Sequence, residues 1–148
     1  MPTFTPRLNL TQPDTGNKTW ETAVEDWADQ LDKAAAQYLS IHLGGAAIDE
    51  EVIFDGLFFD EDVDITKVTL HAREAPGGAV FAIDFTKGGL PQSKFASIAD
   101  GSKKGSTAIT GLSYTTLEEF GIKVKSVGSI TPGSEITILV HYHIKALP

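Results

Sequence analysis

The stretch Glu135-Ile-Thr-Ile-Leu-Val-His-Tyr-His-Ile144 alternates apolar and polar residues over most of its length. One set is Ile136, Ile138, Val140, Tyr142 and Ile144, and the other is Glu135, Thr137, His141 and His143. Successive side chains of a β-strand point to opposite faces, so this pattern predicts a strand with one buried and one wet face. Leu139 alone departs from the pattern.

Short segments of the same kind, separated by turn residues, fill the chain after Ile48. In two of them the expected inward sets are Phe81, Ile83 and Phe85, and Phe120, Ile122 and Val124. Strands are predicted over 52–59, 65–73, 79–85, 94–98, 107–114, 120–127 and 135–144. The segments between them are rich in Gly and Pro, and no helical pattern interrupts them. The sequence therefore predicts an antiparallel, jelly-roll-like β-sandwich of seven or eight strands over residues 48–148.

The chain before this region has a different character. Residues 1–18 carry Pro2, Pro6, Pro13 and Gly16 without periodic hydrophobicity, which predicts an extended arm. Such an arm stays ordered only when something holds it. Residues 19–43 are predicted to form an amphipathic helix, with Thr19 as N-cap, because apolar residues recur every three or four positions. The stripe is Trp20, Val24, Trp27, Leu31, Ala34 and Tyr38.

The stripe has two open interpretations. It spans less than three heptads, which is short for an independent coiled coil, so it could pack on its own domain or associate with copies of itself. The residues predicted to anchor the chain to neighbouring subunits are Leu8, Leu10, Trp20, Val24, Trp27, Leu31 and Tyr38. The chain is therefore predicted to be mainly β, with an arm and one helix ahead of a sandwich.

Composition narrows the function classes. Of 148 residues, 20 are Asp or Glu and 12 are Lys or Arg, so the formal charge is -8, which argues against nucleic acid and anionic membranes as partners. Without cysteine, the chain has no disulfide, thiolate metal site or cysteine nucleophile. The first ten residues lack the apolar segment of a signal peptide, and no run approaches the roughly 18 apolar residues of a membrane span.

Two stretches resemble bacteriophage tail-fibre, spike and capsid-associated proteins. The first is Leu8-Asn-Leu-Thr-Gln-Pro-Asp-Thr-Gly-Asn-Lys-Thr-Trp20, followed by Trp27, which is similar to the opening of many fibre proteins. The second runs from Val68-Thr-Leu-His-Ala-Arg-Glu-Ala-Pro-Gly-Gly78 through Ala82-Ile-Asp84 to Ser126-Val-Gly-Ser-Ile-Thr-Pro-Gly-Ser-Glu-Ile-Thr-Ile138. It is similar to jelly-roll modules at the ends of phage structural proteins. These loose patterns together cover most of the chain.

The resemblance implies a homotrimeric, non-enzymatic virion protein without a cofactor, made in the host cytoplasm and bound to other virion structural proteins. The fibre-like opening favours a tail or neck fibre or spike component. The chain lacks the repeated shaft of long fibres, which leaves a capsid decoration (cement) protein as an alternative. A carbohydrate-binding adhesin module, with a host-surface glycan as partner, is an alternative of another class.

Candidate metal sites are weak. Asp60, Asp62 and Asp64 have the spacing that opens an EF-hand loop, but Ile65 replaces the required Gly and His71 the required Glu. A looser calcium site with Asp49, Glu50 or Asp55 remains as an alternative to a solvated acidic turn. His141 and His143 are expected on one face of their strand, and His71 could join that face or its equivalent on another subunit, which would give a three-histidine site on a symmetry axis. Unliganded surface histidines are the preferred interpretation, so no metal is predicted.

No catalytic signature is present in the sequence. Gly101-Ser-Lys-Lys-Gly105 lacks the spacing of a phosphate loop and the helix that follows one, so it is interpreted as a flexible hairpin tip. Glu118 and Glu119 fall in a predicted turn, where solvation is expected to leave the acidity of a carboxyl group at its ordinary value. Core packing explains most of the aromatic residues, which are Phe54, Phe58, Phe59, Phe81 and Phe85, whereas Tyr114 and Tyr142 are less certain. No catalytic residue is predicted.

Overall fold

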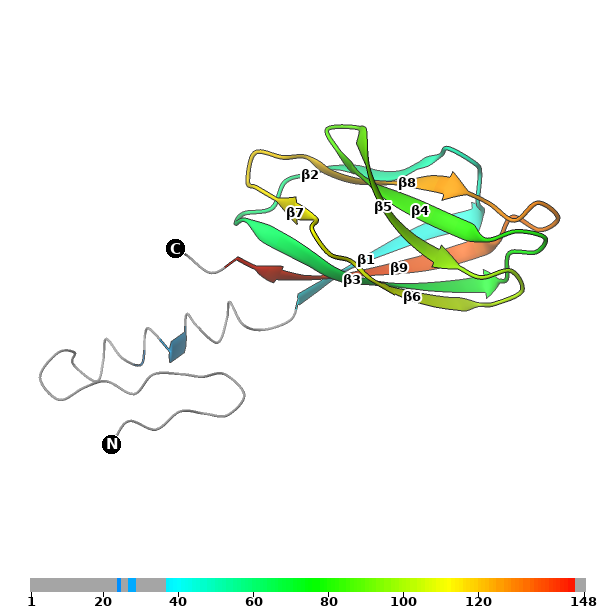
Figure 1. Ribbon diagram of the computed structural model, residues 1–148, viewed down its shortest axis with the longest axis horizontal. Coiled ribbons are helices and arrows are strands. Elements are labelled where there is room, and N and C mark those ends of the chain that lie inside the picture. The colour runs from blue at the N-terminus through cyan, green and yellow to red at the C-terminus, as the bar shows by residue number, and fades with distance from the viewer. Residues whose placement is uncertain (1–23, 25–26, 29–36, 146–148) are drawn as a thin grey trace, which may run out of the picture.

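The computed structural model describes residues 24, 27–28 and 37–145, and residues 37–145 form two β-sheets packed face to face (Figure 1). The strands are β1 (Gln37–Ala46), β2 (Val52–Leu57), β3 (Val63–Glu74), β4 (Phe81–Lys87), β5 (Leu90–Ile98), β6 (Lys104–Ala108), β7 (Ser113–Tyr114), β8 (Phe120–Ser126) and β9 (Ser134–Ile144). The predicted β-sandwich is confirmed.

Each sheet is built from strands that are distant in sequence. The first, here called the β9 sheet, has the order β1-β9-β3-β6, with β7 also pairing with β3. The second, here called the β8 sheet, has the order β2-β8-β4-β5. All strand pairs in both sheets are antiparallel, as predicted from the absence of helical crossovers.

The core lies between the sheets and consists of the residues that alternation placed on the inward faces. From the β9 sheet it takes Ile136, Ile138 and Val140, and from the β8 sheet Phe81, Ile83, Phe85, Phe120, Ile122 and Val124, all fully buried. Tyr142 and Ile144 share the inward face of β9 but are only partly buried, because β9 runs out to the end of the sandwich there. The predicted inward sets are confirmed.

The predicted helix is wrong over its last seven residues. Residues 37–43 belong to strand β1, so the sandwich begins at Gln37 instead of residue 48. Leu39, Ile41 and Leu43 alternate with exposed residues, and this period of two outweighed the helical stripe that ended at Tyr38. Val24, Trp27 and Ala28 are helical, and the rest of the predicted helix and the whole arm lie outside the described residues.

Three further predictions are wrong. Residues 107–114 are not one strand, because β6 ends at Ala108 and the short β7 begins at Ser113. The segment Gly101-Ser-Lys-Lys-Gly105 is not a hairpin tip, because it links β5 in one sheet to β6 in the other. Phe58 follows the end of β2 and is 52% exposed, so it is not a core residue.

The two long sides of the sandwich differ. On one side, here called the closed side, edge strands β5 and β6 touch: a Cβ added at Gly105 would overlap the carbonyl oxygen of Ser97. On the other side, here called the open side, the edges are β1 and β2, and a pocket opens between them. The open side therefore has unpaired strand edges next to incompletely buried apolar side chains.

Candidate functional site

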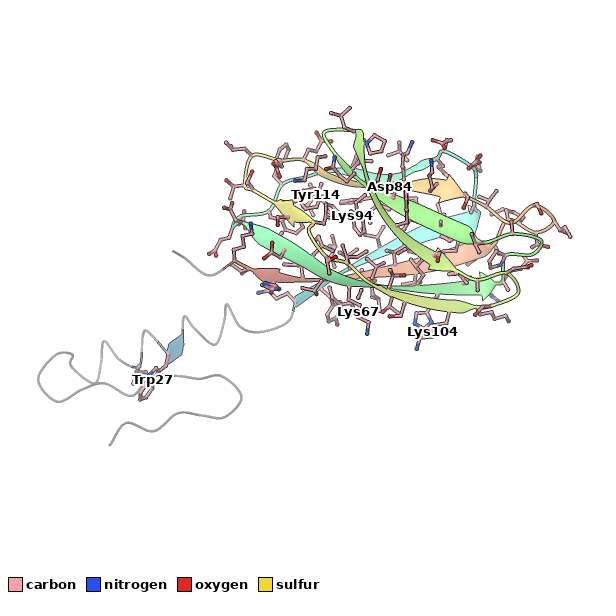
Figure 2. All side chains as sticks on the ribbon, viewed as in Figure 1. Trp27, Lys67, Asp84, Lys94, Lys104 and Tyr114 are labelled. Carbon is pink, nitrogen blue, oxygen red and sulfur yellow. The ribbon has the colours of Figure 1, made fainter. Side chains whose placement is uncertain are left out.

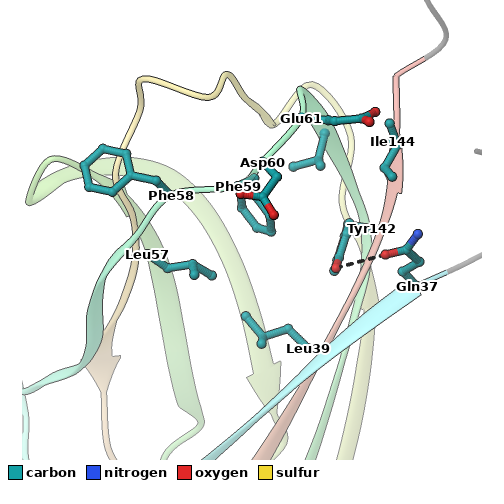
Figure 3. Close-up of a pocket in the computed structure, with 10 residues that line it drawn as sticks. Gln37, Leu39, Leu57, Phe58, Phe59, Asp60, Glu61, Tyr142 and Ile144 are labelled. Carbon is teal, nitrogen blue, oxygen red and sulfur yellow. Dashed lines mark hydrogen bonds between the residues drawn. The ribbon is translucent and has the colours of Figure 1, made fainter.

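The pocket on the open side has a volume of about 440 Å³ (Figure 3). Its apolar walls come from β1, from the end of β9 and from the segment that follows β2, and the wall residues are Leu39, Leu57, Phe59, Tyr142 and Ile144. The chain enters β1 at Gln37 and leaves β9 at Ile144, and both residues line the pocket. The pocket thus lies where the sandwich joins the rest of the chain.

The polar groups at the pocket are a hydrogen-bonded tyrosine–glutamine pair and two carboxylates. The Tyr142 hydroxyl donates to Gln37 Oε1 at 3.2 Å, which connects β9 to the start of β1. Asp60 and Glu61 contribute carboxylates to the lining, and Figure 3 shows Glu61 next to Ile144 and Asp60 next to Phe59. The pocket is therefore an apolar opening with two anionic groups.

Phe58 and Phe59, which follow β2, differ in how far they are buried. The Phe59 ring lies 5.2 Å from the Tyr142 ring and 5.4 Å from the Phe120 ring, which ties the pocket to the buried core. Phe58 lines the same pocket but is 52% exposed. An exposed aromatic beside an apolar opening is typical of a surface that contacts another polypeptide.

Tyr114 lies between the two sheets (Figure 2), and its ring is 6.0 Å from that of Phe59 in the pocket wall. Its hydroxyl donates to the carbonyl oxygen of Thr86 at 3.0 Å, which joins β7 of the β9 sheet to β4 of the β8 sheet. Burial raises the pKa of the Tyr114 phenol, and the nearby Glu118 and Asp84 carboxylates raise it further. The phenol stays protonated at neutral pH and keeps its role as hydrogen-bond donor.

The predicted acidic site is divided among separate contacts. Asp62 accepts from the Thr116 backbone N–H at 3.2 Å, Asp64 accepts from the Ser113 hydroxyl, and Asp60 lines the pocket. Glu50 pairs with Lys123 at 2.6 Å, and this hydrogen bond is the main cause that lowers the pKa of Glu50. Residues 37–145 contain no group of three or more acidic or histidine side chains arranged to hold a metal ion.

The predicted turn carboxylates also have partners. Glu118 pairs with Lys87 at 3.0 Å, and this hydrogen bond, followed by one from the Thr115 backbone, lowers the pKa of Glu118. Glu119 accepts from the Gly56 backbone N–H at 3.1 Å. The two neighbouring carboxylates therefore stabilise different loops.

The histidines lie on the outer face of the β9 sheet. His141 and His143 share that face of β9, and His71 lies on it in the neighbouring β3, as the sequence suggested. They do not converge: His143 Nε2 lies 3.4 Å from Asp64 Oδ2, and the His141 ring packs 6.1 Å from Tyr38. A fourth histidine, His42 on β1, bonds to Glu135 at 2.8 Å.

The predicted anchor residues divide into two groups. Leu8, Leu10, Trp20 and Leu31 lie outside the described residues. Of the others, Val24 is helical and 54% exposed, Trp27 is helical and partly buried, and Tyr38 lies on the outer face of β1 with 66% of its surface exposed. Tyr38 is therefore not on a helical stripe, although its exposure leaves it free to contact a partner.

The pocket itself was not predicted from the sequence. Its walls come from β1, which was taken as helix, and from 57–59, which was taken as the end of a strand. The available signal was the alternation Leu39-Ser-Ile-His-Leu43, which begins directly after Tyr38, the last residue of the helical stripe. Which strand edges meet at the opening depends on sheet order, which alternation within single strands does not encode.

Comparisons with known proteins identify no family for this chain. No protein-family model matches the chain, and no curated protein matches it. A solved structure described as "Bacillus endospore appendages form a novel family of disulfide-linked pili" is similar over 76% of this chain and 88% of that chain, with 12% sequence identity and a TM-score of 0.45. Likeness at this level supports no conclusion about function. Within the described residues, no helix is long and apolar enough to span a membrane.

Proposed function

We propose that this chain is a non-enzymatic structural protein of a bacteriophage virion, a homotrimer anchored through its N-terminal region with the sandwich facing outward. The observation that carries the proposal is the apolar pocket on the open side, at the end where the chain enters β1 and leaves β9. A neighbouring subunit placed there would bury Leu57, Phe58 and Leu39 and cover the unpaired edges of β1 and β2.

The strand order supports the finer prediction of a jelly roll. Strands β1 to β4 alternate between the sheets, and the remaining strands complete a five-stranded layer, in the order β1-β9-β3-β6 with β7 beside β3, and a four-stranded layer in the order β2-β8-β4-β5. Two packed antiparallel layers of this kind are common in viral capsid domains and lectins. Because the same architecture has many functions, the assignment to a virion depends on the sequence resemblance and on the pocket.

The first experiment tests whether the open side is a subunit interface. Phe58→Ser removes an exposed aromatic from the pocket, and Phe95→Ser removes one of similar exposure from β5 on the closed side. Light scattering during gel filtration of the full chain should give trimers for the wild type and for Phe95→Ser. Phe58→Ser should require roughly tenfold or more protein to form trimers, because buried interface aromatics contribute about 2 kcal/mol.

Two outcomes would contradict the interface. One is a wild-type chain that stays monomeric at every concentration tested, and the other is an equal effect of both substitutions on assembly. Far-ultraviolet circular dichroism checks that each variant is folded, so that a loss of trimer is not a loss of structure.

The second experiment tests the virion assignment. Deleting residues 1–18 should abolish incorporation into particles, while the near-ultraviolet spectrum of the sandwich stays unchanged. Normal incorporation of the truncated chain would count against the anchoring role. The copy number per particle then separates the components: a few trimers indicate a tail or neck fibre or spike, and hundreds indicate capsid decoration.

A further inference from the structure

The outer face of the β9 sheet has two cationic rows, although the chain as a whole is acidic. The pairing of β1, β9, β3 and β6 fixes which side chains lie beside one another. One row crosses the strands as Tyr38, His141, Lys67 and Ala108, and the other as His42, Thr137, His71 and Lys104. The rows are four residues apart along each strand, or about 13 Å at roughly 3.3 Å per residue.

Within residues 37–145, the cations nearest the middle of this face have no acidic partner. Lys67, His71, Lys104 and His141 form no ion pair in that part of the chain, and Figure 2 shows Lys67 and Lys104 on the side of the sheet away from the core. The carboxylates on the same face are already bound at its ends. Glu135 contacts His42 and the Gly45 N–H, and Asp64 lies near His143 and Lys145. Arg73 adds a further positive charge beside Glu135.

The band between the two rows consists mainly of short side chains. Ser40, Leu139, Thr69 and Ser106 lie side by side across the four strands. Two hydroxyls, those of Ser40 and Ser106, are exposed, and at one end the Tyr38 ring is 66% exposed and packs on His141. Small hydroxyl side chains and an exposed aromatic ring suit the hydroxyl groups and ring faces of sugars, whereas the flanking cations suit acidic groups.

The acidic residues of the chain are concentrated elsewhere. Four of them, Asp49, Glu50, Glu51 and Asp55, lie in or just before β2 of the other sheet. Packed sheets are about 10 Å apart, and charges are screened over about 8 Å in physiological salt, so these carboxylates act weakly on a ligand at the outer face of the β9 sheet. The net charge of the whole chain therefore does not describe this face.

We propose that the outer face of the β9 sheet binds an acidic polysaccharide, a sugar chain that carries repeated carboxylate, sulfate or phosphate groups. The chain lies along the band of short side chains, and its acidic groups contact Lys67 and His141 on one side and His71 and Lys104 on the other. The proposal does not depend on trimer formation, because every group it uses lies within one subunit.

The charged groups that face the ligand are mostly positive. They are Lys67, Arg73, Lys104, Lys145, Glu135 and Asp64, and His42, His71, His141 and His143 lie on the same face. Since Glu135 and Asp64 are paired at the ends of the face, Lys67 and Lys104 set the charge of its middle.

The test measures binding of the purified full chain to polygalacturonate and dextran sulfate, with neutral dextran as control, by calorimetry in 0.15 M salt. Saturable binding to an acidic polymer at pH 5.5 is expected. The double variant Lys67→Gln/Lys104→Gln should weaken binding by about tenfold, at roughly 0.5–1 kcal/mol per exposed charge contact. The matched control, Lys94→Gln/Lys125→Gln, removes the same charge from the β8 sheet and should change binding by less than about twofold.

The outcomes separate the alternatives. If both double variants weaken binding equally, the effect is one of net charge and the proposed face is wrong. If neither acidic polymer binds at pH 5.5, or if duplex DNA of equal charge binds more tightly than both, the polysaccharide proposal is overturned. Trimer formation is measured on the same samples. A loss of trimers without a loss of binding, or the reverse, shows that the two proposals fail independently.

Discussion

The edge strands of the two sheets meet on the closed side of the sandwich but are separated on the open side. On the closed side β6 approaches β5 so closely that only glycine fits at position 105, and Ile98 at the end of β5 is fully buried. On the open side the β1 and β2 edges are separated by a pocket with incompletely buried walls. The closed side therefore joins the two sheets within one subunit, and under our proposal the open side is completed by a neighbouring subunit.

The largest expected effect comes from the aromatic cluster in the core next to the open side. Phe120 is fully buried, and its ring lies within about 6 Å of the rings of Phe54, Phe59, Phe85 and Tyr114. Phe120→Ala should cost about 3–5 kcal/mol of unfolding free energy, measured by urea denaturation, because it leaves a cavity in the core beside the pocket. A loss below about 1 kcal/mol would mean that this cluster does not support the open side.

The second prediction contrasts one glycine from each side. A Cβ at Gly105 would overlap the Ser97 carbonyl, whereas a Cβ at Gly44 on β1 meets no atom within 4 Å. Gly105→Ala should cost about 1–3 kcal/mol because β5 and β6 must separate, and Gly44→Ala should change stability by less than about 0.5 kcal/mol. Similar losses in chemical denaturation for both variants would remove the distinction between the sides.

The third prediction concerns two tyrosine hydroxyls. Tyr114 donates to a backbone carbonyl inside the sandwich, and Tyr142 donates to Gln37 at the pocket. Tyr114→Phe leaves the Thr86 carbonyl without that donor and should cost about 1–2 kcal/mol, whereas Tyr142→Phe should cost under about 1 kcal/mol, since water can replace it at the open pocket. Thermal unfolding of both variants shows which substitution costs more stability. A larger loss of stability for Tyr142→Phe than for Tyr114→Phe would contradict the prediction.

The smallest predicted effect is a pH dependence at the edge of the open side. Hydrogen bonds from the Gly45 N–H and from His42 lower the pKa of Glu135. A lowered pKa in the folded state means that the stabilisation is present above the ordinary carboxyl pKa of about 4.3 and is lost as pH falls through the folded value. The Tm difference between wild type and Glu135→Gln should therefore shrink below about pH 4. A difference that stays constant from pH 6 to pH 3 would show that the charge of Glu135 does not matter.

The sequence predicted the interior of the fold better than its edges. Alternation identified the inward sets of β4, β8 and β9, because residues buried on one face follow a strict period of two. It failed at Tyr38, where a helical spacing that began with Trp20 coincided with the first residues of a strand. The prediction that residues 1–18 anchor the chain stays a prediction, since they lie outside the described residues.

The candidate sites were predicted only in part. The shared face of His141 and His143 followed from single-strand alternation, whereas the place of His71, Lys67 and Lys104 on the same face depends on how β3, β6 and β9 pair. The pocket required both the true start of β1 and the separation of the sheet edges. Features that depend on sheet order are set by contacts between distant segments, which local patterns do not reveal.

Hydrogen exchange of the full chain, compared between a dilute monomeric sample and the assembled trimer or particle, tests the role of the open side most directly. The expected result is slower exchange on assembly for backbone amides of β1 and of residues 57–61, with no change along β5 and β6. Unchanged exchange at β1 and 57–61, or new protection confined to β5 and β6, would contradict the account.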